Sequence, residues 1–163
     1  MAAFMRESLK IIALCVGAAI AYGIVHDQFT ARICIEYFTV FHPPVFATQS
    51  PTTLAFGWGI IATWWVGGFL GLLLVIAARA GSRPPLTAKS LIRPIGTLLL
   101  VMATCAILFG VAGFVLAQRE VVSLPEWVAH KLPRSAYPRF MADWWAHNAS
   151  YASGPSADWC FAY

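Results

Sequence analysis

The chain has 163 residues, of which 60% are hydrophobic and only 11% are charged, and its formal net charge is +4. Soluble domains carry about 25% charged residues, so this composition excludes an ordinary soluble domain and indicates a single integral membrane domain in the lipid bilayer. The net positive charge does not indicate nucleic-acid binding, because most basic residues flank apolar segments, where they set topology and contact anionic lipid.

The first apolar stretch, residues 9–25, is predicted to form the first transmembrane span. Its Ala19-Ile20-Ala21 motif has the small-x-small form of a signal-peptidase site, so cleavage of residues 1–21 is the alternative. We favour an uncleaved helix, because Tyr22 and Gly23 continue the apolar pattern without a break. Either reading leaves residues 26–53 on the outer side of the membrane.

The outer-face segment 26–53 begins with helical character that extends to about Phe41. The sequence His42-Pro43-Pro44 is expected to end this short helix, because proline lacks a backbone donor and restricts the residue before it. Ser50 before Pro51 is typical of a helix start, with a capping side chain followed by proline at the first helical position.

Two further spans are predicted at residues 54–79 and 95–117, since neither segment contains Asp, Glu, Lys, Arg or His apart from Arg79 at the very end of the first. The linker 80–93 contains basic residues and no acid, so we expect it to be cytoplasmic. The N-terminus is then cytoplasmic and the C-terminus external, which in a bacterium means the inner membrane with the C-terminus in the periplasm.

Glycines mark one face of the second of these three helices, with a GxxxG spacing from Gly67 to Gly71. Such spacing favours close helix contact, either within the chain or between subunits. This face is therefore where we expect a homo-oligomer or a larger membrane complex to form.

The last segment, 118–163, is predicted to fold back as a helical cap on the outer face. A short helix is expected from Ser123 to Lys131 and a longer one from Arg139 to Tyr151. Cys34 and Cys160 both fall on the outer side, where an oxidising compartment would allow a bridge between them, but sequence alone does not fix their distance.

The predicted fold is therefore all-α, with three transmembrane helices, a short outer-face helix and a C-terminal helical cap. Imidazoles and carboxylates from two distant segments gather on the outer face in this topology. Zn²⁺ takes three or four nitrogen or oxygen ligands and non-haem iron takes two histidines and a carboxylate, so we expect a divalent transition metal, either zinc or iron. The predicted ligands are His26, Glu36, His42, Asp143 and His147.

Three residues are predicted to take catalytic roles beside such a metal. Arg32 could hold an anionic substrate group, Tyr37 could donate a proton, and Glu36 could act as an acid or base. These roles lead to a membrane metal-binding protein or metalloenzyme as the predicted function. Two alternatives stay open: a purely structural polar network, and a non-catalytic accessory subunit that docks through the glycine face.

Overall fold

The computed structural model describes residues 2–80 and 85–156, and all regular structure in these ranges is helical. In chain order the elements are α1 (Ala2–Ile33), the π-helical turn η1 (Tyr37–Phe41), α2 (Pro51–Ile61), α3 (Trp64–Arg79), α4 (Ala88–Gln118), α5 (Glu126–Ala129), the 3-10 turn η2 (Arg134–Ala136) and α6 (Tyr137–Ser156). Three stretches, Phe4–Ile33, Pro51–Arg79 and Ala88–Gln118, are long and apolar enough to cross a membrane. The predicted all-α class with three spanning segments is confirmed.

Helix α1 is longer than the span predicted at residues 9–25. It continues as one helix of 32 residues, so His26 and Asp27 belong to its last two turns and not to a separate outer helix. Neither glycine nor proline occurs between Gly23 and Ile33 to interrupt it. The short outer helix is reduced to η1, which ends at His42 in extended backbone, directly before the two prolines as predicted.

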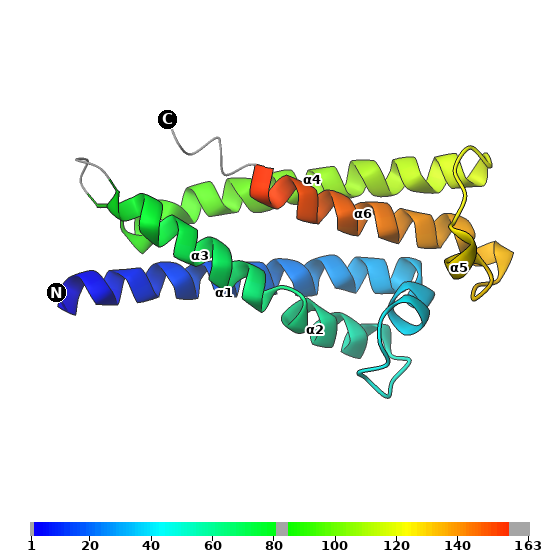
Figure 1. Ribbon diagram of the computed structural model, residues 1–163, viewed down its shortest axis with the longest axis horizontal. Coiled ribbons are helices and arrows are strands. Elements are labelled where there is room, and N and C mark those ends of the chain that lie inside the picture. Colours follow the sequence, from blue (N-terminus) through cyan, green and yellow to red (C-terminus); the bar gives the residue numbers. More distant parts are fainter. Residues whose placement is uncertain (1, 81–84, 157–163) are drawn as a thin grey trace.

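The second span is two helices and not the single helix expected to run to about Ala80. Helix α2 ends at Ile61 and α3 begins at Trp64, with Ala62 and Thr63 between them. The Thr63 hydroxyl donates to the Gly59 carbonyl at 2.5 Å, and such a bond back to the preceding turn bends a helix. The bend lets α2 and α3 each pack against a different part of α1 (Figure 1).

Glycine contacts hold the second span against α1. A Cβ at Gly67 would lie 2.7 Å from the Cys15 carbonyl oxygen, and a Cβ at Gly71 would lie 2.9 Å from Ile12 Cα. The GxxxG face therefore packs within the chain in this structure. An assembly of several chains through this face stays a prediction.

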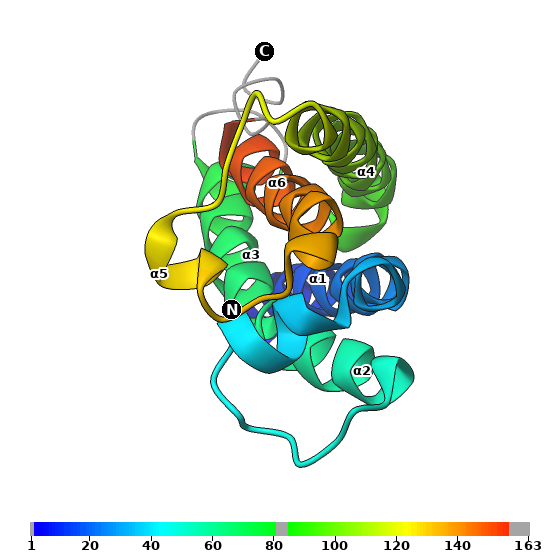
Figure 2. The ribbon, with the colours of Figure 1, turned by 90° about the vertical axis from the view of Figure 1, so that its right-hand side faces the viewer.

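The C-terminal segment folds back as a helix that packs along α4. Helix α6 begins beside the C-terminal end of α4 and runs antiparallel to it, back toward the middle of the bundle (Figures 1 and 2). Gly113 permits this approach, since a Cβ there would lie 2.8 Å from the Met141 carbonyl oxygen and 2.9 Å from Trp145. The cap is thus longer than residues 139–151 and lies at the same level as the last turns of α1.

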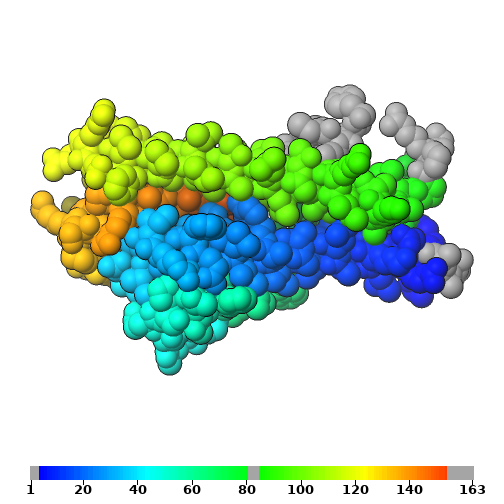
Figure 3. Space-filling model, turned by 180° about the vertical axis from the view of Figure 1, so that it is seen from behind, coloured from blue at the N-terminus to red at the C-terminus, as the bar shows by residue number. Residues whose placement is uncertain are grey.

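Two apolar clusters stabilise the bundle. The larger lies at the end formed by η1, α2, α5 and α6, and includes the fully buried Phe140 and Leu54. The smaller joins Ile11 and Cys15 of α1 to Leu91 of α4 near the other end. Figure 3 shows α1 and α4 side by side along one face, with α6 visible between them.

Candidate metal centre

Three side chains from α1 and α6 meet in the interior of the bundle. His26, Asp27 and His147 each offer one ligand atom, and these atoms all lie within 4.8 Å of one another. His147 Nε2 is 3.3 Å from Asp27 Oδ1, and the two imidazole rings are 4.6 Å apart at an angle of 85°. We refer to these residues as the His26–Asp27–His147 cluster.

The helices around the cluster are fixed by small and polar residues one turn further into the bundle. Tyr22 Oη and Ser150 Oγ are 2.8 Å apart, so a hydrogen bond joins α1 to α6 directly next to the cluster. Ala146 and Ala149 of α6 are buried and lack bulk, which lets α6 approach its neighbours closely. Helix register therefore brings together residues that are about 120 positions apart in sequence.

The hydrogen bonds of His147 define which ring nitrogen faces the cluster. Its Nδ1 donates to the backbone carbonyl of Asp143, one turn earlier on α6, at 2.8 Å. In the neutral ring the Nε2 then carries a lone pair, and that lone pair faces a carboxylate oxygen of Asp27. Two acceptors at this distance repel unless a proton or a metal cation lies between them. His26 Nε2 is also buried and has no hydrogen-bond partner among the described residues.

His42 lies beside the cluster but is not one of its three members. Its Nδ1 donates to the Tyr37 carbonyl at 2.8 Å, and its ring centroid is 4.6 Å from that of Trp58. Burial lowers the pKa of His42, with the nearby His147 acting in the same direction, so the ring is neutral at pH 7. Neutral imidazole is the form that binds metal.

Asp143 is fully buried, but its carboxylate does not pair with the His147 side chain as the sequence spacing suggested. Neither carboxylate oxygen has a hydrogen-bond partner among the described residues. Burial raises the pKa of Asp143 to about 9, and the charges of Asp27 and Glu36 add to this effect. The side chain is therefore a neutral acid at pH 7 in the metal-free protein.

Arg32 and Glu36, two of the predicted catalytic residues, make local contacts outside the cluster. Arg32 is exposed and donates to the Gln28 side chain at 2.6 Å and to the Thr52 hydroxyl at 2.8 Å. Glu36 accepts a hydrogen bond from the Cys34 thiol at 3.3 Å. Burial raises the pKa of Cys34 to about 12, so the thiol keeps its proton and remains a donor.

Tyr37, the third predicted catalytic residue, is close to the cluster. Its ring centroid is 4.5 Å from that of His147, and it is buried. Burial raises the pKa of Tyr37 well above its ordinary value, so its hydroxyl stays protonated. Cys160, by contrast, lies outside the described residues, so its predicted bridge to Cys34 stays a prediction.

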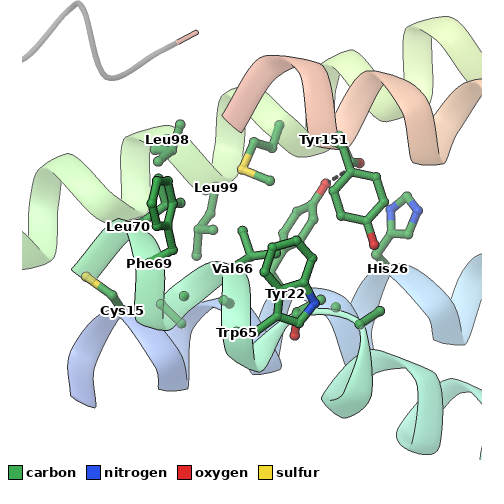
Figure 4. A pocket seen from close by; sticks show the side chains of 18 of the residues that line it. Cys15, Tyr22, His26, Trp65, Val66, Phe69, Leu70, Leu98, Leu99 and Tyr151 are labelled. Carbon is green, nitrogen blue, oxygen red and sulfur yellow. Dashed lines mark hydrogen bonds between the residues drawn. The ribbon is translucent and has the colours of Figure 1, made fainter. Parts of the chain in front are cut away.

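The cluster forms the polar end of a cavity of about 600 Å³ bounded by α1, α3, α4 and α6. Tyr22, Ser150 and Tyr151 line the cavity next to the histidines, and Leu98 and Leu99 line its far end (Figure 4). The cavity therefore combines a hydrogen-bonding end with an apolar body.

Asp27 is the cluster residue that the predicted ligand set omitted. Its sequence signal was its position next to His26, inside what proves to be a continuous spanning helix, where an acid is costly and usually functional. The chain matches no family model, no curated protein and no solved structure, so its function must be argued from the site itself.

Proposed function

We propose that this membrane protein binds a divalent transition metal, zinc or iron, through His26, Asp27 and His147. The observation that carries the proposal is that His147 Nε2 and Asp27 Oδ1 lie 3.3 Å apart, a distance at which two unprotonated atoms would repel each other, with His26 Nε2, unpaired among the described residues, in reach. A cation between them converts this repulsion into coordination.

The local hydrogen bonding of the cluster suits metal binding. A ligating histidine commonly donates its other ring nitrogen to a carbonyl or carboxylate, which fixes the tautomer and the ring orientation. The bond from His147 Nδ1 to the Asp143 carbonyl has this form. Two histidines and one carboxylate are also the ligand set of many non-haem iron centres, and three protein ligands are typical of catalytic zinc.

The number of ligands favours a catalytic over a structural metal. Structural zinc sites are closed by four protein ligands, whereas catalytic sites keep a position open for water or substrate. Three ligands at the end of a cavity would leave such a position directed to a bound molecule. A membrane metalloenzyme is therefore the form of the proposal that we favour.

The competing explanation is a structural polar network in which a proton bridges Asp27 and His147. Both the metal site and the proton-bridged network would remove the repulsion between Asp27 and His147, but only the metal site requires a metal. The accessory-subunit alternative stays a prediction, and the glycine face on which it depends contacts α1 within the chain in this structure.

Metal analysis of detergent-purified protein tests the proposal. Protein purified without chelator and then dialysed should retain stoichiometric zinc or iron, and His147→Ala should lose it. His130→Ala is a matched control, because His130 makes the same bond from Nδ1 to the carbonyl four residues earlier but is exposed and outside the cluster. Retention of metal by His147→Ala, or no metal uptake by the wild type from any supplied zinc or iron salt, would overturn the proposal.

Cobalt substitution gives a second readout that does not depend on the native metal. Co²⁺ bound by two imidazoles and a carboxylate absorbs visible light with a pattern that reports its ligands. Asp27→Asn should change this spectrum, whereas Glu36→Gln should leave it unchanged, because Glu36 lies outside the cluster. Identical spectra for wild type and Asp27→Asn would remove Asp27 from the ligand set.

A further inference from the structure

The cavity beneath the cluster has a shape and lining of its own that the metal does not explain. A single ion occupies little of the cavity, whose volume of about 600 Å³ falls within the range of pockets that bind small organic molecules, roughly 300–1,000 Å³. Its body is lined by aliphatic side chains of three helices, among them Leu70 and Leu73 of α3, Leu98 and Leu99 of α4, and Ala18 of α1.

The charge of the lining limits what can bind. None of the described residues that line the cavity is a lysine or an arginine. An anionic head group, such as a carboxylate or phosphate, would be moved from water into a low-dielectric site without a protein cation to pair with it, which is costly. An uncharged molecule carries no such penalty, so the lining selects against anionic lipids.

Three hydroxyl groups gather at one end of the cavity. Tyr22 and Ser150 are bonded to each other at 2.8 Å, and Tyr151 lies beside them near His26 (Figure 4). Hydroxyls can both donate and accept, so they suit an oxygen-bearing head such as an alcohol, a phenol or a quinone carbonyl. This distribution, polar at one end and apolar along the rest, matches an amphiphile with one chain.

The cavity is accessible from the region of the lipid tails. Helices α3 and α4 both line it yet make little contact with each other (Figure 1). Trp65 and Phe69 of α3 lie at its edge with 57% and 58% of their surface exposed. Because both belong to a segment apolar enough to span the membrane, a molecule dissolved in the bilayer can reach the cavity sideways.

We propose that the cavity binds one uncharged, single-chain amphiphile from the bilayer, with its oxygen-bearing head at Tyr22, Ser150 and Tyr151 and its chain between α3 and α4. The proposal does not require the metal, since none of these contacts involves it. If a metal is bound at the cluster, the head of this molecule is the part that lies closest to it.

Native mass spectrometry of the delipidated full chain tests this proposal with four probes that share a decyl chain. Decanol and a decyl-substituted benzoquinone are the uncharged probes, and decanoate and decyl phosphate are the charged ones. We expect one uncharged molecule to bind per chain, at least about tenfold more tightly than either charged probe. Equal binding of charged and uncharged probes, or no binding of the uncharged ones, would overturn the proposal. The two uncharged probes also show whether the head is an alcohol or a quinone.

A pair of variants on neighbouring positions of α4 shows whether binding is in the cavity. Leu99→Trp fills the cavity and should weaken binding of the uncharged probes by about tenfold or more. Leu100→Trp places the same bulk on the lipid-facing side, where Leu100 is 68% exposed, and should bind as the wild type does. Leu70→Trp from α3 is the replacement if Leu99→Trp loses its cooperative melting transition. Equal binding by the cavity variant and by Leu100→Trp would mean surface adsorption and would refute the cavity site.

Chelation separates this proposal from the proposed function. In protein treated with chelator, where no metal cation faces the head group, the uncharged probes should still bind with the expected selectivity. If metal analysis shows no metal while the probes still bind with the expected selectivity, only the metal proposal fails. If metal binds and no probe does, only the amphiphile proposal fails.

Discussion

Replacing Asp143 by asparagine should change how the stability of the metal-free protein depends on pH. The fully buried carboxyl keeps its proton in the folded protein up to about pH 9, whereas the unfolded chain releases it near its ordinary pKa of 3.8. Between these values unfolding releases one proton, so a rise in pH favours the unfolded state. Asparagine has nearly the same shape and does not titrate, and it therefore removes this contribution.

The magnitude follows from the size of the window. Between the ordinary pKa of 3.8 and the folded pKa of about 9, each rise of one pH unit lowers the free energy of unfolding by about 1.4 kcal/mol. From pH 7 to pH 8 the wild type should therefore lose about 1.4 kcal/mol relative to Asp143→Asn, or about 3–6 °C in melting temperature for a chain of this length. The comparison with Asp143→Asn isolates Asp143, because the contributions of all other titrating groups, such as the histidines and the Cys34 thiol, are common to both proteins and cancel in the difference.

Thermal unfolding followed by intrinsic fluorescence, in detergent with chelator present, measures this effect. Between pH 7 and pH 8 the melting temperature of the wild type should fall more steeply than that of Asp143→Asn. Parallel curves for the two proteins would refute the reasoning, because they would mean that Asp143 is already ionised in the folded state. Metal-loaded protein provides a further comparison, since a nearby cation favours the ionised carboxyl and should reduce the slope.

Three further predictions concern packing, coupling and topology. Gly67→Ala should destabilise the folded protein by about 1–3 kcal/mol, because its Cβ would lie 2.7 Å from backbone atoms of α1. Gly17→Ala is the control and should leave the melting temperature unchanged, because a Cβ there would have nothing within 4 Å. A double-mutant cycle of His147→Ala and Asp27→Asn in metal-loaded protein should show a coupling free energy of about 0.5–3 kcal/mol. If the stability changes of the two variants simply add, the two residues do not interact. A cysteine at the exposed Ser123 should react with a membrane-impermeant reagent from outside intact cells, and a reporter fused into the α3–α4 linker should read cytoplasmic; the reverse pattern would invert the topology.

The sequence by itself determined the all-α membrane class of the protein and indicated the segments that contribute to its candidate site. Long apolar segments must form helices in a bilayer, because no other open structure satisfies the backbone there, and this property can be read locally from composition. His26 and His147 stood out for the same reason: ionisable residues are rare in this chain, and each is expensive to keep near the membrane. The stop at His42 and the start at Ser50 follow from proline and capping chemistry and were also predictable.

Only the tertiary structure decided which of the polar residues meet. The pairing of Asp27 with His147 depends on the depth to which α6 returns along α4 and on the uninterrupted continuation of α1, and neither can be read from a local pattern. Arg32 donates hydrogen bonds to Gln28 and Thr52, outside the cluster. The Asp143 carboxylate makes no hydrogen bond with His147 among the described residues, although the spacing places both residues on one helical face. Residue spacing fixes which side chains share one helix face, but the rotation and relative depth of two packed helices come from glycine and alanine contacts summed over their whole length.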